Sequence, residues 1–67
     1  MTHKMFSFTG SGCHLTGIYT DNNKTKEPYA LYSHYWNQGD HRSLVARFCT
    51  AADLLKAAAN VAIHGHI

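Results

Sequence analysis

The feature that most constrains the fold of this chain is a change in hydrophobic period near Thr50. Before it, four segments alternate apolar and polar residues, which is the pattern of half-buried β-strands. After it, apolar residues recur at helical spacing as far as Gly65, a residue suited to ending a helix. Strands followed by one helix cannot alternate into a parallel sheet. We therefore predict an α+β fold: a four-stranded antiparallel β-meander with one C-terminal amphipathic helix packed on one sheet face.

Turn-forming residues separate the predicted strands, which cover residues 4–9, 13–20, 29–36 and 42–49. The glycines of residues 10–12 suit a tight hairpin, residues 21–28 form a polar loop that ends in proline, and residues 37–40 form a turn. Gly17 interrupts the second strand and predicts either a bulge or a close packing contact.

The helix begins with a recognisable cap. Thr50 and Asp53 have the spacing of a capping box, and Asp53 also complements the helix dipole. Apolar residues at helical spacing then predict the buried face: Leu54, Leu55, Ala58 and Val61. We expect this face to cover the following strand residues: Phe6, Phe8, Leu44, Ala46 and Phe48.

Length and composition indicate one small domain over residues 1–67. A chain of this size buries only about 60% of the surface that it exposes when unfolded, so a partner or self-association would help to stabilise it. Charged residues are 15% of the chain, against about 25% in a typical globular protein. Low charge combined with eight aromatic residues favours a protein that binds other molecules, and a homodimer is possible.

The charge of the chain and its N-terminal residues do not indicate a dedicated nucleic-acid domain, a membrane span or a signal peptide. The net charge is +2 and the basic residues are scattered, without the basic stripe of a dedicated nucleic-acid domain. No apolar run approaches the length of a membrane span, and residues 1–5 lack the apolar core of a signal peptide. Cys13 and Cys49 are expected to be reduced thiols in the cytoplasm.

The histidines and cysteines raise the alternative of a small metal- or thiol-dependent protein. Cys13-His14 and His64-Gly65-His66 offer ligand atoms, but their spacing does not fit the paired ligands of a structural zinc site. A Cys/His nucleophilic pair would need a cleft and an orienting third group. We therefore predict no cofactor, no metal site and no catalytic residue, and a protein that is not an enzyme.

The aromatic strand at residues 29–36 carries large rings on both faces, of which one is expected to be core and the other uncovered. Tyrosine, tryptophan and arginine are the residue types that dominate protein interfaces. We predict that the partner-binding residues are Tyr29, Tyr32, His34, Tyr35, Trp36 and Arg47. The alternative is that the rings pack on one another and only stiffen the sheet.

Three functional hypotheses follow. The first is a small non-enzymatic protein-binding module, an inhibitor or modulator of a larger protein or nucleoprotein complex, of the kind that phages and mobile elements encode. The second is a single-stranded nucleic-acid-binding protein that stacks bases on the aromatic strand. The third is the metal- or thiol-dependent protein described above.

Overall fold

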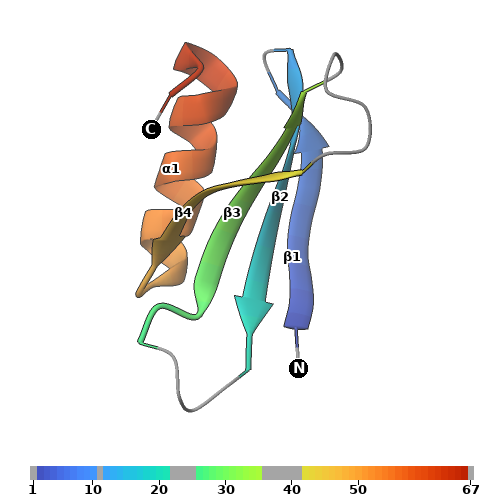
Figure 1. Ribbon diagram of the computed structural model, residues 1–67. Coiled ribbons are helices and arrows are strands. Elements are labelled where there is room, and N and C mark those ends of the chain that lie inside the picture. The colour runs from blue at the N-terminus through green and yellow to red at the C-terminus, as the bar shows by residue number, and fades with distance from the viewer. Residues whose placement is uncertain (1, 11, 22–25, 36–41, 67) are drawn as a thin grey trace.

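A computed structural model describes residues 2–10, 12–21, 26–35 and 42–66, and these residues form the predicted α+β fold (Figure 1). The strands are β1 (Thr2–Thr9), β2 (Cys13–Thr20), β3 (Tyr29–Tyr35) and β4 (Ser43–Phe48), and the helix is α1 (Ala51–His64). All neighbouring strands pair antiparallel in the order β1-β2-β3-β4. The helix packs against β2, β3 and β4, so the predicted meander and its helix are confirmed. Trp36, His41 and the predicted turn at residues 37–40 lie outside the described residues.

Both ends of α1 are capped, by the Thr50 half of the predicted capping box and by the predicted Gly65 stop. Thr50 is extended (φ −130°, ψ 154°), and its Oγ1 accepts a hydrogen bond of 3.2 Å from the backbone N–H of Asp53. At the other end Gly65 adopts the left-handed conformation with φ 82°, and its N–H donates to the carbonyl of Val61 at 2.9 Å. The helix therefore starts and stops where local sequence chemistry dictates.

The Thr50 cap gives a first testable expectation. Replacing Thr50 with alanine removes the acceptor of the Asp53 N–H and should lower the free energy of unfolding by about 1 kcal/mol. Thermal unfolding followed by circular dichroism should show a melting temperature lower by roughly 4–8 °C. Thr50→Ser keeps the hydroxyl and serves as the control. Equal melting temperatures for Thr50→Ala and Thr50→Ser would contradict this role.

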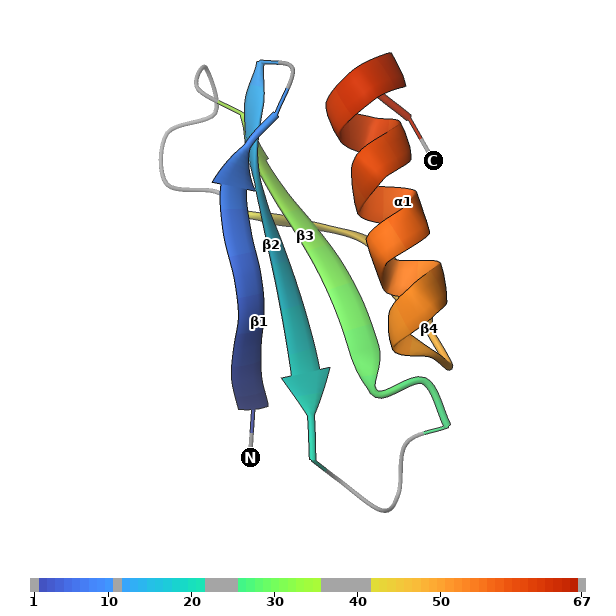
Figure 2. The ribbon, with the colours of Figure 1, turned by 180° about the vertical axis from the view of Figure 1, so that it is seen from behind.

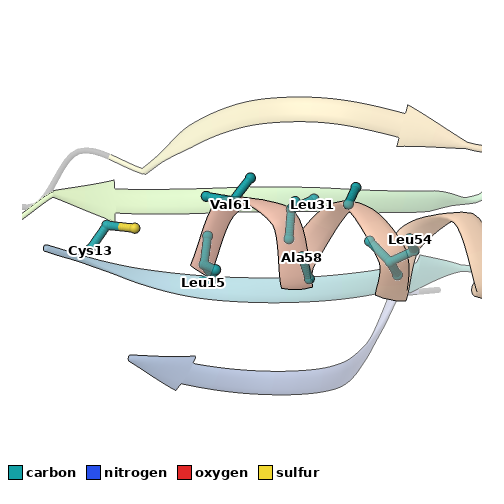
Figure 3. Close-up of a cluster of buried hydrophobic side chains, with 7 residues drawn as sticks. Cys13, Leu15, Leu31, Leu54, Ala58 and Val61 are labelled. Atoms are coloured by element: carbon teal, nitrogen blue, oxygen red, sulfur yellow. The ribbon is translucent and has the colours of Figure 1, made fainter. Parts of the chain in front are cut away.

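The hydrophobic core lies between α1 and the two central strands (Figure 3). Leu15 of β2, Leu31 of β3 and Leu54 of α1 are fully buried. The remaining buried residues of the cluster are Cys13, Ala57, Ala58 and Val61. The alanines allow the helix backbone to approach the sheet closely, while the leucines fill the space between them.

The core differs from the sequence prediction in its position on the sheet. Leu44, Leu55 and Phe8 were expected in the core, but they are 48%, 53% and 37% exposed. Phe6 and Phe48 pack only at the margin of the cluster. A helix is about 10 Å wide and strands are about 4.8 Å apart, so one helix covers about two strands. Here α1 packs on β3 and reaches both of that strand's neighbours, β2 and β4, and leaves the edge strand β1 largely uncovered (Figure 2).

Two irregularities in the strand pairing also change which face a residue occupies. Between β3 and β4 the register shifts, so Ala46 lies opposite Leu31 while Leu44 lies opposite Tyr32. Leu44 and Ala46 were predicted to share a face, and they lie on opposite faces instead. In β1 a shift at Met5 places Lys4 and Phe6 on opposite faces, opposite Ile18 and Gly17 respectively. A β-bulge adds one residue and reverses the alternation beyond it, which a period-2 pattern cannot represent.

Gly17 is a close packing contact, one of the two alternatives predicted for it. The ring of Phe6 lies on the glycine so closely that a β-carbon there would overlap its edge. Phe6 and Gly17 are cross-strand partners, and the missing side chain of one makes room for the ring of the other. Phe6 therefore lies flat on the sheet at the edge of the core.

Candidate binding surface

The candidate site is the sheet face opposite α1, called the open face below. Strand register identifies its members because paired residues share a face and neighbours along a strand alternate. Its residues are Thr2, Lys4, Ser7, Thr9, His14, Thr16, Ile18, Thr20, Ala30, Tyr32, His34, Leu44 and Arg47.

One row of paired residues crosses the whole open face and has a cation at each end. Lys4 on β1 pairs with Ile18, Ile18 with Ala30, and Ala30 with Arg47 on β4. Lys4 and Arg47 are exposed, Ile18 is half-buried and Ala30 is buried. At about 4.8 Å between strands, the two outer residues stand roughly 14 Å apart at the backbone. Two basic side chains thus lie on either side of the apolar residues Ile18 and Ala30.

Tyr32 lies at the centre of the next row. Its cross-strand partners are Thr16 on β2 and Leu44 on β4, and Leu44 is the exposed apolar neighbour of the ring. The guanidinium of Arg42 lies over the ring, 5.3 Å from its centroid, which is within the range of a cation–π interaction. Arg42 is thereby held against the open face although it precedes β4.

Two histidines form the third row. His14 on β2 lies directly opposite His34 on β3, and both are half-buried. Ser7 of β1 hydrogen-bonds through its Oγ to Nε2 of His14. The imidazoles bring donor and acceptor atoms to this end of the open face, next to Tyr32 in the preceding row.

The ionisable residues of this surface are all of the basic type. Lys4, Arg42 and Arg47 carry its positive charges. The acidic residues that the structure describes lie elsewhere: Asp21 follows β2, Glu27 precedes β3, and Asp53 is in the first turn of α1. Among the described residues, the strand-paired positions of the open face therefore include basic side chains and no acidic one, which suits an acidic partner surface.

The predicted site residues divide between the two faces of the sheet. Tyr32, His34 and Arg47 come together on the open face. Tyr29 and Tyr35 lie on the helix side, where both pack against the core cluster. Trp36 is outside the described residues. Lys4 and Arg42 were missed, because the bulge at Met5 reverses the face of Lys4 and Arg42 reaches Tyr32 from outside β4.

The third hypothesis was a metal- or thiol-dependent protein. Among the described residues, no group of three or more histidine, cysteine or acidic side chains is placed to hold a metal ion. Cys13 is a buried core residue and Cys49 is exposed, and both are free thiols. No pocket is found in the described part of the chain.

Comparisons with known proteins do not assign a function to this chain. No helix within the described ranges has both the length and the apolar character needed to cross a membrane. No protein-family model, curated protein or solved structure matches this chain.

Proposed function

We propose that this chain is a non-enzymatic binding module whose open face binds an acidic surface of a larger protein or nucleoprotein complex. The observation that carries the proposal is that the described, strand-paired positions of that face include basic side chains and no acidic one, with Lys4 and Arg47 at opposite ends of one row. Such a field accelerates encounter with an acidic partner and selects against basic ones.

The arrangement of side chains supports a protein partner. Ile18, Tyr32 and Leu44 supply an apolar centre, and arginine and lysine side chains surround it. Protein interfaces have this anatomy, and tyrosine and arginine often contribute most of their binding energy. The antiparallel sheet also holds these groups in fixed positions, so little conformational entropy is lost on binding.

A role as an inhibitor or modulator fits a chain that is mostly one binding surface. Occupying a site on a larger complex needs no catalytic group, and a domain of this size is of the kind that phages and mobile elements encode for that purpose. The free thiols of Cys13 and Cys49 fit the reducing environment of the cytoplasm.

Affinity capture tests the proposal. The chain is immobilised, exposed to cell lysate in nuclease-treated and untreated halves, and the retained material is identified by mass spectrometry. We expect one protein at near-stoichiometric yield in both halves, and loss of that protein from a Tyr32→Ala/Arg47→Ala bait. Both side chains are on the surface of the sheet, so circular dichroism should show the variant folded. Retention of the same protein by the folded variant would contradict the proposal.

Single-stranded nucleic acid is the second candidate ligand. The specific observation in its favour is that Tyr32 lies among Lys4, Arg42 and Arg47, because base stacking combined with phosphate contacts needs such a set. Arg42 already stacks on the ring, however, so a base would compete with it. Nucleic-acid binding predicts capture only in the untreated half, and an affinity for a single-stranded oligonucleotide that falls steeply with added salt. A flat salt response would exclude this candidate.

A further inference from the structure

The third row of the open face places two histidines that are far apart in the sequence directly opposite each other. His14 lies on β2 and His34 on β3, the two central strands of the sheet (Figure 1). The sequence indicated no metal site because its spacing was compared with templates in which ligands lie close together in the chain. Strand pairing instead brings these two ligands together from separate segments.

The separation of the two strands suits one ion held by both rings. Side chains directly opposite each other on antiparallel strands have β-carbons about 4.5–5.5 Å apart. Two nitrogen ligands on one tetrahedral zinc ion lie roughly 3.4 Å apart, since each Zn–N bond is about 2.0–2.1 Å long. The two imidazoles therefore need to lean only slightly towards each other. Both side chains are half-buried, so the sheet restricts their rotation.

A neighbouring strand orients one of the two rings. Ser7 of β1 hydrogen-bonds through its Oγ to Nε2 of His14. Metal-binding histidines normally hold their second ring nitrogen in such a bond, which fixes the direction of the nitrogen that binds the metal. With Nε2 bonded to Ser7, coordination by His14 would be through Nδ1. Ser7 is thus a positioning residue for the histidine pair.

We propose that His14 and His34 together bind one divalent late-transition-metal ion, of the class of Zn²⁺, on the open face. Zinc, nickel and copper accept imidazole nitrogen as a ligand, whereas magnesium and calcium prefer oxygen. A structural zinc site has four protein ligands, and no group of even three is found among the described residues. Two protein ligands leave coordination positions for water, so the ion exchanges with solvent. The site needs no acidic partner and is independent of the function proposed above.

The basic residues of the open face lie far enough away to permit a bound cation. Lys4 and Arg47 belong to the row of Ile18, which stands roughly 14 Å along β2 from the row of His14. At physiological ionic strength, exposed charges are largely screened beyond about 8 Å. Arg42 is nearer, but its guanidinium lies over the ring of Tyr32.

A second histidine pair in the chain serves as an internal control. His64 and His66 are exposed at the end of α1, and their ring centroids are 6.3 Å apart. Only Gly65 separates them in the sequence, so they can bind an ion in the unfolded chain as well as in the folded one. His14 and His34 come together only when β2 pairs with β3. An ion bound by them therefore stabilises the folded state, while an ion bound equally by both states does not.

Thermal unfolding with and without zinc tests the site. The whole chain is prepared without an affinity tag, freed of metal with a chelator, and melted in the presence of ZnCl2 or MgCl2. We expect zinc to raise the melting temperature by at least ~5 °C and magnesium to leave it unchanged. The rise should disappear in His14→Ala/His34→Ala and persist in His64→Ala/His66→Ala, which removes the same number of histidines.

Each protein is compared with itself, so a change in its starting stability does not affect the result. No rise in the wild-type protein would overturn the proposal, as would an equal rise with magnesium or a rise that survives in His14→Ala/His34→Ala. Should that double variant fail to fold, His34→Gln removes one ligand and keeps a polar side chain. We expect it to lose most of the rise, and a full rise would overturn the proposal equally.

Nuclear magnetic resonance locates the ion directly. When the isotope-labelled chain is titrated with ZnCl2, the largest shift changes should occur in the imidazole signals of His14 and His34, with smaller changes at Ser7. Changes confined to His64 and His66 would overturn the site. That result would leave the proposed binding of an acidic partner untouched, because capture of the partner is measured without added metal.

Discussion

Replacing Leu31 with alanine should lower the free energy of unfolding by about 2–5 kcal/mol, enough to unfold much of the protein at room temperature. Leu31 is fully buried at the centre of β3, beneath α1 and beside the small partners Gly17 and Ala46. Neither partner has a side chain that could move in to fill the space. The substitution therefore leaves a cavity in addition to removing buried apolar surface, and the two effects add.

Leu44 is the matched control for this experiment. It is also a strand leucine, it lies one row away opposite Tyr32, and it is 48% exposed. Leu44→Ala should lower the free energy of unfolding by less than ~1 kcal/mol, since solvent already reaches much of the side chain. Urea titrations at one protein concentration measure both variants. Similar losses from the two substitutions would mean that the core is not centred on β2 and β3.

Reversing the two charges at the ends of the basic row should abolish partner binding. Lys4→Glu/Arg47→Glu turns both ends of the row from attraction to repulsion of an acidic surface. The affinity for the captured partner should fall at least ~100-fold, or about 2.7 kcal/mol. The dependence of the affinity on salt concentration should also weaken, because salt screens the attractive charge interactions that these substitutions remove.

A second charge reversal separates this local effect from net charge. Lys26 and Lys56 are exposed residues that lie off the open face, before β3 and on α1. Lys26→Glu/Lys56→Glu changes the net charge by the same amount and should retain most of the affinity. Calorimetric titration at low and high salt measures both pairs. Equal losses in the two variants would assign the binding to net charge and not to the open face.

The fold was predictable from the sequence because its determinants are local. The alternating segments, the glycines around the first hairpin, the Thr50 cap and the Gly65 stop each act within a few residues. An antiparallel meander joins successive strands to their neighbours, so the element order also gave the topology. The central position of the helix was not predictable, because strand patterns do not show which strands one helix will cover.

The candidate site was predictable only where alternation is undisturbed. Tyr32 and His34 follow the regular alternation of β3, and Arg47 lies in the part of β4 that keeps register with it. Lys4 and Leu44 lie beyond register shifts. The sequence prediction placed Leu44 on the wrong face and did not include Lys4 in the site. The shift in β1 lies opposite Gly17, the glycine that predicted a bulge or a close packing contact, whereas the shift in β4 has no such sequence signal.

We propose that the open face is where this chain meets its partner. The most direct test of this proposal is nuclear magnetic resonance of the isotope-labelled chain titrated with the captured partner. We expect the largest shift changes at open-face residues, including Lys4, His14, Tyr32, His34 and Arg47, with α1 little affected. Changes concentrated on α1 and Phe8, with the open face unperturbed, would contradict it.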